Sequence, residues 1–179
     1  QGLFEICVHP SLRSPGILPN GRNAQTAAMI SVIIPYYNPS GEEQLEKMLR
    51  RAISSAVSQA RPNSDDIEVI VVDDGSPRQP REAVSAFNSY PVRLIEAEHG
   101  RLGAARNRGI EAAGGEIIAF LDADDYYFED SLMPCAEAMR AADADLLQFR
   151  FSMLYESAGS DISHSSEQCA EAIPTGGHK

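Results

Sequence analysis

The chain has 179 residues, of which 43% are hydrophobic and 23% are charged, so it can form one domain with a real core. Its formal net charge of -11 at pH 7 argues against binding nucleic acid through the phosphates, which requires clustered Lys and Arg. No apolar run approaches the roughly 18 residues of a membrane span. The three cysteines fit neither a metal-binding spacing nor a closed disulfide framework, which favours a reducing compartment.

The two ends of the chain differ in composition from its middle. Residues 1–28 are rich in Pro, Gly, Asn and Ser and show no sustained period, which predicts a leader or flexible arm with little fold. A short arm packed on the domain is the alternative. Residues 157–179 are again small and polar and predict a loop or tail. We therefore expect a single domain over residues 29–156, truncated so that its acceptor region is incomplete.

Between these ends, apolar runs alternate with helical patterns. Residues 30–35 (ISVIIP) predict a strand, and apolar residues from Leu45 to Val57 recur at three- and four-residue steps, which predicts an amphipathic helix. The alternation continues with strands at 67–72, 92–98, 116–121 and 145–155, separated by helices at 81–89, 101–113 and 131–142. Apolar strands separated by helices predict an α/β fold, with a mostly parallel sheet and helices on both faces.

Polar and aromatic residues follow three of these strands, where each strand ends. PYYNPSG follows the first strand, DDGSP follows the strand at 67–72, and DADDYY follows the strand at 116–121. In a parallel sheet such ends meet at one edge, where ligands of α/β proteins bind. If the extended conformation persists, Asp122 and Asp124 project to the same side, and paired carboxylates suit Mg2+ or Mn2+. Asp73 and Asp74 should face opposite ways, so that at most one of them reaches the same ligand.

Other residues of these turns have simpler interpretations. Asp125 precedes a helix and is expected to be a turn residue or a helix cap. Tyr126 and Tyr127 are expected to pack, and Gly75 is expected to serve the backbone conformation of its turn.

VIIPYYN, EVIVVDDGS, GAARNRGI and GEIIAFLDADD, in this order and spacing, resemble the nucleotide-sugar-binding domain of family 2 glycosyltransferases, which have the GT-A (Rossmann-like) fold. The resemblance covers roughly residues 30–155. It implies an inverting transfer of a sugar from a nucleoside diphosphate sugar, usually a UDP-sugar, to an acceptor hydroxyl, with Mn2+ or Mg2+ as cofactor. The acceptor could be a glycan, a lipid-linked sugar or a protein, and the oligomeric state stays open.

The resemblance also implies roles for individual residues. Two aromatic or apolar residues would line the base pocket, one acid would bind the base, and the other polar residues would surround the sugar, the phosphates and the metal. In chain order these are Pro35 and Tyr37 (base pocket, with Tyr37 stacking), Asp74 (base), Arg106 and Asn107 (donor side), Asp122 (ribose or metal shell) and Asp124 (metal). His99 stands where relatives often have Asn. No catalytic base is identified, because Asp161, His164 and Glu167 lack supporting context.

Other functions remain to be weighed against this one. A dinucleotide-dependent oxidoreductase would carry G-x-G-x-x-G after the first strand, where this chain has YYNPSG. A P-loop NTPase would carry G-x-x-x-x-G-K-[ST], and a nucleotidyltransferase would have a Gly-rich basic loop there. The strongest alternative is a nucleotide-sugar-binding module, or a fragment, without the acceptor half. The implied location is cytoplasmic, with the inner face of the membrane as the alternative for a longer protein.

Overall fold

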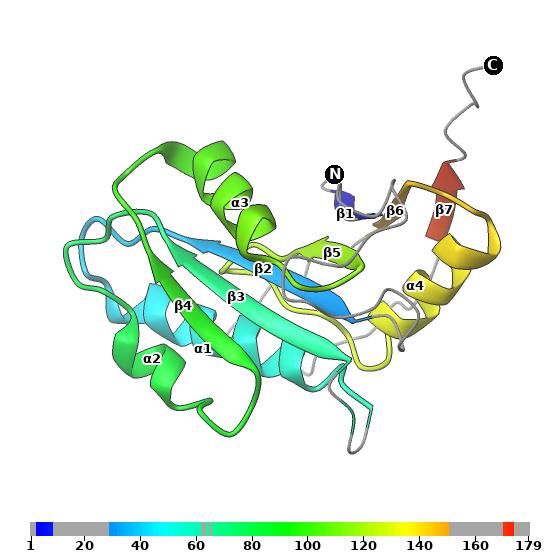
Figure 1. Ribbon diagram of the computed structural model, residues 1–179. Helices are drawn as coiled ribbons and strands as arrows, with labels where there is room; N and C mark the ends of the chain where they lie inside the picture. The colour runs from blue at the N-terminus through cyan, green and yellow to red at the C-terminus, as the bar shows by residue number, and fades with distance from the viewer. Residues whose placement is uncertain (1–2, 9–28, 62–63, 65, 151–169, 174–179) are drawn as a thin grey trace, which may run out of the picture.

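The computed structural model describes residues 3–8, 29–61, 64, 66–150 and 170–173. Over these residues the strands form one seven-stranded sheet in the order β4-β3-β2-β5-β1-β6-β7 (Figure 1). Four neighbouring strands are parallel: β2 (Ile30–Tyr36), β3 (Ile67–Asp73), β4 (Val92–Glu96) and β5 (Ile117–Phe120). The other three, β1 (Leu3–Val8), β6 (Leu146–Arg150) and β7 (Ala170–Ile173), join through antiparallel pairs. The prediction of an α/β fold with a mostly parallel sheet is confirmed.

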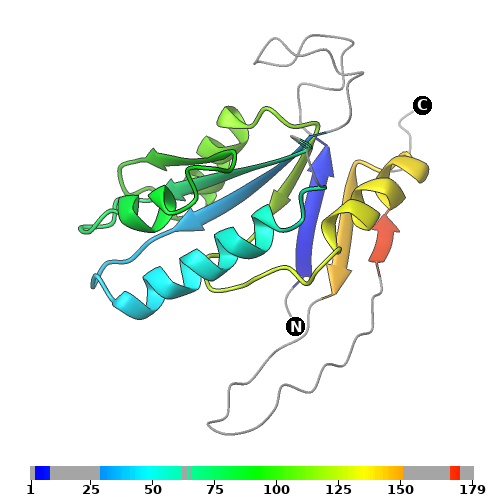
Figure 2. The same ribbon diagram turned by 90° about the horizontal axis from the view of Figure 1, so that it is seen from below.

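Helices cover both faces of the parallel part of the sheet (Figure 2). Helix α3 (Arg101–Ala112) packs on one face, where its residue Ala105 meets the side chains of Ile33 and Ile70. On the opposite face lie α1 (Glu43–Val57), α2 (Arg81–Ser85) and α4 (Leu132–Ala141). Helix α4 begins two residues before Pro134, which is compatible with proline because the first helical turn needs no intrahelical N–H donors.

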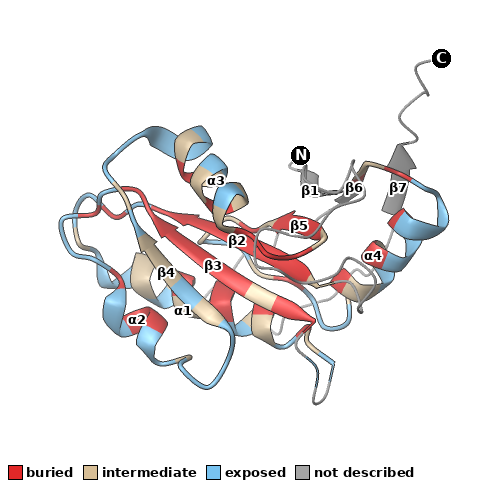
Figure 3. Cartoon of the chain, viewed as in Figure 1, coloured by how far each residue is buried: buried red, intermediate tan, exposed pale blue. Residues whose placement is uncertain are grey.

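The central strands are apolar throughout because both of their faces are covered. Ile30, Val32 and Ile34 of β2 belong to the core on the α1 side, whereas Ile33 belongs to the core on the α3 side. All four are buried, and burial runs along the whole of β2 and most of β3 (Figure 3). A strand buried on both faces loses the alternating pattern of a half-exposed strand, which is why the sequence shows continuous runs.

The N-terminal segment differs from its expected lack of fold. Strand β1 lies between β5 and β6, because Ile6 is opposite Ala119 on one side and Leu147 on the other. Strand β7 likewise lies in the segment expected to be a tail, and it pairs with β6. Both strands are short, and an isolated short run gains stability only from an available sheet edge, which local sequence patterns do not reveal. Residues 9–28 and the strand predicted beyond Arg150 fall outside the described residues.

Within the part of the chain that the structure describes, no helix combines the length and the hydropathy needed to cross a membrane.

Candidate functional site

The three chemically unusual strand ends lie at the same edge of the sheet. Strands β3 and β5 are the two parallel neighbours of β2, so their carboxyl ends flank its carboxyl end. Main-chain hydrogen bonds continue this arrangement past the strands. The Asp74 amide donates to the Tyr36 carbonyl at 2.8 Å, and the Leu121 amide donates to the Ile33 carbonyl at 3.0 Å. The turns that follow β2, β3 and β5 therefore share one edge, as the sequence predicted.

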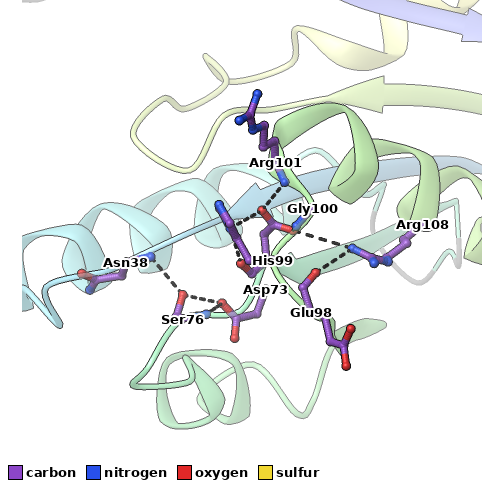
Figure 4. Close-up of polar contacts among 9 residues, drawn as sticks. Asn38, Asp73, Ser76, Glu98, His99, Gly100, Arg101 and Arg108 are labelled. Atoms are coloured by element: carbon purple, nitrogen blue, oxygen red, sulfur yellow. Dashed lines mark hydrogen bonds and ion pairs between the residues drawn. The ribbon is translucent and has the colours of Figure 1, made fainter.

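The first acid after β3 is engaged within its own turn. Asp73 is buried, and its Oδ1 accepts hydrogen bonds from the amide and the hydroxyl of Ser76. Burial raises the pKa of Asp73, and the hydrogen bonds from Ser76 only partly offset that effect. The Ser76 hydroxyl also accepts from the Asn38 amide at 2.9 Å, which links this turn to the segment after β2 (Figure 4). Asp73 therefore stabilises the turn rather than facing a ligand.

The second acid, Asp74, binds the segment that begins α3. Its Oδ1 accepts from the Gly100 amide at 2.8 Å, and its Oδ2 accepts from the Arg101 amide at 2.8 Å (Figure 4). The His99 Nδ1 lies 2.9 Å from Oδ2, and the Arg108 guanidinium lies 3.6 Å from Oδ1. Arg101 has a φ of 69°, a left-handed backbone that few side chains adopt, and Asp74 stabilises it by accepting its N–H.

The aromatic part of the site is a ring pair. Tyr37 is 43% exposed and stacks on His99, with 4.4 Å between ring centroids and 28° between ring planes. Gly75 lets His99 approach, because its φ is +79° and a Cβ at this position would lie 2.9 Å from the His99 nitrogen. The expected backbone role of Gly75 is confirmed. Pro35 lies inside β2, where it is buried and opposite Val72 of β3.

The acidic loop, defined here as residues 121–128, departs from the extended conformation assumed in the sequence analysis. Strand β5 ends at Phe120, and a turn follows in which the Asp125 amide donates to the Asp122 carbonyl at 3.0 Å. The extended conformation on which the expected same-side projection of Asp122 and Asp124 depended therefore does not persist beyond Phe120. The physical reason lies in Tyr127, whose buried hydroxyl donates to the Phe120 carbonyl at 3.0 Å. That contact folds the chain back toward the end of β5.

Two arginines from opposite faces of the sheet contact the acidic loop. Arg106 of α3 donates to the Asp122 carboxylate at 3.0 Å and lies over the Phe120 ring. Arg51 of α1 donates to the Asp124 carbonyl at 2.9 Å. The Nε atom of Arg106 is buried and has no hydrogen-bond partner among the described residues.

The carboxylates of the loop fit a hard divalent cation by their chemistry. Burial raises the pKa of Asp125, and the negative charges of Asp124 and Asp122 raise it further, so the three acids lie close enough to repel. Carboxylate oxygens are the ligands that Mg2+ and Mn2+ prefer. Among the described residues no three acids, His or Cys form a ready-made cage. A cation here would complete its shell with water and ligand phosphates, as Mg2+ commonly does.

Asp125 is a turn residue, as expected, but it does not cap the following helix. Helix α4 begins at Leu132, and the side chain of its N-cap residue, Ser131, makes no capping hydrogen bond. Gln59, two residues beyond the end of α1, does this instead, because its Oε1 accepts from the amides of Ser131 and Leu132 at 3.0 and 3.1 Å. The helix end is thus satisfied from a distant element.

Sequence reasoning missed two residues that organise this edge, Arg51 and Arg101, and it named His99 without its contacts. The available signal for Arg51 was a spacing of four residues between polar positions 51, 55 and 59, along the predicted helix and just beyond it. Contacts of His99 and Arg101 with Asp74 join residues 25 and 27 positions apart, which no local pattern predicts. The candidate bases Asp161, His164 and Glu167 lie outside the described residues.

Comparison with known proteins points to one family. Residues 31–166 match the sequence model described as glycosyl transferase family 2. The chain is 37% identical over 102 residues to the uncharacterized glycosyltransferase EpsJ of Bacillus subtilis, covering 55% of this chain and 26% of that protein.

Solved structures give the same result. The crystal structure of S. aureus TarS 1–349 in complex with UDP-GlcNAc matches with a TM-score of 0.56 and 29% identity, covering 66% of this chain and 33% of that one. The mannosyltransferase PcManGT from Pyrobaculum calidifontis, in complex with GDP-Man and Mn2+, matches with a TM-score of 0.54 and 26% identity, covering 64% and 33%. The chain thus spans between 26% and 33% of the length of these three proteins.

Proposed function

Because this chain belongs to glycosyl transferase family 2 and has the GT-A fold of its structural neighbours, we propose that it forms the donor-binding part of an inverting, metal-dependent glycosyltransferase. The donor is a UDP-sugar, and the acceptor is a hydroxyl group. The observation that carries the proposal is the shared sheet edge, where the turns after β2, β3 and β5 present an exposed aromatic ring and an acidic loop together.

The aromatic groups would bind the base of the donor, and the acidic loop would bind its diphosphate through the cation. The exposed ring of Tyr37 offers a stacking surface for the nucleobase, and His99 supports its other side. Asp74 would hydrogen-bond the base, and its carboxylate oxygens also hold the Gly100 and Arg101 amides at the beginning of α3. Pro35 supports the floor of the pocket from within β2. TarS binds UDP-GlcNAc, which favours uracil as the base, whereas PcManGT binds GDP-Man and makes guanine the alternative.

The acidic loop would hold the cation and the diphosphate. Asp124 would ligate the metal ion, and Asp122 would lie in the metal shell or near the ribose. When bound, the metal ion supplies positive charge that stabilises the departing diphosphate. Arg106 balances the charge of Asp122 in the structure, and its guanidinium can turn to the donor phosphates once a cation takes over that role. Direct inversion requires an acceptor base, for which the described residues offer no assigned group.

Calorimetric titration of UDP with and without Mn2+ tests the proposal, using the unmodified protein and Asp124→Ala. We expect UDP binding to weaken about tenfold or more when either the ion or the carboxylate is removed, since each loss breaks the same bridge. Glu111→Ala is the matched control, because it removes an exposed carboxylate from α3. Equal affinity with and without Mn2+ would reject the metal bridge, and tighter binding of GDP than UDP would reject uracil as the base.

A second candidate function is nucleotide-sugar binding without transfer. It requires only the turns after β2, β3 and β5, which the structure brings to one edge of the sheet. Incubation with a UDP-sugar, with and without simple sugar acceptors, separates the two candidates. Release of UDP by transfer or hydrolysis supports the enzyme, whereas metal-dependent UDP binding without any release supports the binding module.

A further inference from the structure

One stripe of side chains, on helix α1 and just beyond its end, contacts the acidic loop. Arg51 and Ser55 lie on one side of α1, and Gln59 follows two residues after the last residue of the helix, Val57. Arg51 donates to the Asp124 carbonyl at 2.9 Å, and the Ser55 hydroxyl accepts from the Tyr127 amide at 3.1 Å. Gln59 donates to the Phe128 carbonyl at 2.8 Å. All three contacts are made to main-chain atoms, so the stripe fixes the path of the loop.

The three members of the stripe differ in what else they do. Gln59 is 4% exposed, and both ends of its amide are used, so it belongs to the interior. Ser55 also accepts from a loop amide in a partly buried position. Arg51 is exposed, and its guanidinium lies 4.7 Å from the centre of the Tyr126 ring. Arg51 is therefore the member whose loss should least disturb the core.

Arg51 also contributes charge to the loop. It contacts the main chain of a segment that carries three carboxylates within four residues, Asp122, Asp124 and Asp125. A guanidinium at this place reduces the repulsion among the acids without occupying the Asp124 carboxylate, because the contact is made to the carbonyl.

We propose that Arg51 is a positioning residue that fixes the main chain at Asp124, and thereby sets the affinity of the acidic loop for a divalent cation bound with a nucleoside diphosphate. The inference rests on the proposed function, because it assigns a purpose to a contact with the predicted metal ligand. Arg51 itself touches neither the cation nor the donor. It acts by limiting the positions that the Asp124 carboxylate can reach.

The test compares Arg51→Gln and Arg51→Lys with Arg50→Gln. Arg50 is the adjacent arginine of α1, and it pairs with Glu46 one turn earlier, so its replacement removes the same charge from the same helix. UDP is titrated with and without Mn2+ for each variant. We expect Arg51→Gln to weaken Mn2+-dependent UDP binding about tenfold, the loss typical of one charge-assisted hydrogen bond. Arg51→Lys keeps the charge but loses the planar group, so its Mn2+-dependent affinity for UDP should fall between those of the unmodified protein and Arg51→Gln.

The outcomes separate the positioning role from a general structural role. UDP binding without Mn2+ should be the same in all three variants, and Arg50→Gln should match the unmodified protein. Equal Mn2+-dependent affinity for Arg51→Gln and Arg50→Gln would overturn the inference. So would an equal loss with and without the ion, because that indicates damage to the nucleotide pocket or the fold.

Hydrogen exchange without any ligand keeps the inference testable if the proposed function fails. Should the unmodified protein bind UDP independently of Mn2+, the proposed function is rejected by that protein alone. The amides of Asp125 and Tyr127, which are hydrogen-bonded in the structure, then report on the loop. We expect them to exchange faster in Arg51→Gln than in Arg50→Gln. Unchanged exchange would show that Arg51 does not hold the loop.

Discussion

Asp66 and Asp73 are two buried carboxylates that the structure treats in opposite ways. The Asp66 carboxylate accepts from the Arg61 side chain at 2.6 Å and from the Arg61 amide at 3.2 Å. Burial acts to raise its pKa, but hydrogen bonds from Ser64 and Arg61 outweigh burial and leave the pKa lowered. For Asp73, burial dominates, and the pKa is raised. The surroundings thus stabilise the charged form of Asp66 and the neutral form of Asp73.

This contrast predicts opposite pH dependences for two asparagine variants. Asp66 contributes stability above its unfolded pKa of about 3.9, and that stability is lost as pH falls through its lower folded pKa. Asp73 binds its proton more tightly when folded, so its ionisation reduces stability as pH rises through its raised pKa. Asp66→Asn should therefore be less stable than the unmodified protein above about pH 4, by about 1–3 kcal/mol, and this deficit should shrink as pH falls below about 3.9. Asp73→Asn should gain stability, since an amide oxygen can still accept from Ser76.

Urea unfolding at several pH values measures both effects, with each variant serving as the control for the other. The two stability differences should change in opposite directions as pH rises. A parallel change in both variants would contradict the assigned pKa shifts.

At the scale of single elements, helix α3 shows how closely a helix can approach the sheet. A Cβ added to Gly109 would lie 2.4 Å from the Ile33 side chain, which is closer than real side chains approach. A Cβ added to Gly103 of the same helix would meet nothing within 4 Å. Gly109 therefore permits the packing of α3 on β2, whereas Gly103 only adds backbone freedom to the unfolded chain.

These two glycines give a matched pair of substitutions. Gly109→Ala should lower the free energy of unfolding by about 1–3 kcal/mol, because Ile33 or the helix must move. Gly103→Ala should raise it by up to about 1 kcal/mol, because alanine is the better helix former and the space is open. Denaturant unfolding of both variants measures the difference. A change of the same sign in both would show that the distance between α3 and β2 does not limit the packing.

At the scale of the whole molecule, strand β1 joins two parts of the sheet, the parallel strands β4-β3-β2-β5 and the pair β6-β7. It pairs with β5 on one side and with β6 on the other. Among the described strands, β1 thus provides the hydrogen-bonded link between the parallel half of the sheet and β6. The expected lack of fold in residues 1–28 and the observed pairing of β1 predict different effects of deleting this strand.

Deleting residues 1–8 distinguishes them. The observed pairing predicts faster amide hydrogen exchange in β5 and β6 after the deletion, because each loses hydrogen bonds at the edge that β1 covers. The amides of β3 serve as the internal control, since β3 pairs with β2 and β4. Unchanged exchange in β5 and β6 would support a leader without a structural role.

The sequence by itself determined the parallel core and the place of the site. Strands β2, β3 and β5 were predictable because their continuous apolar runs reflect burial on both faces, a property that each run carries alone. The shared edge followed from parallel topology, and the residue types at the strand ends indicated oxygen ligands, whereas the stacking ring was implied by the family resemblance. Gly75 could be assigned because a positive φ is a local requirement.

Tertiary structure decided the contacts that these residues make. The turn at Asp122–Asp125 depends on where Tyr127 is buried, and the capping of α4 depends on Gln59 from the turn after α1. The carboxylate of Asp74 is directed by amides more than 20 positions away. Strand β1 formed only because the sheet offered an edge between β5 and β6. Each of these depends on partners distant in the chain, whereas a sequence pattern records only the preferences of neighbouring residues.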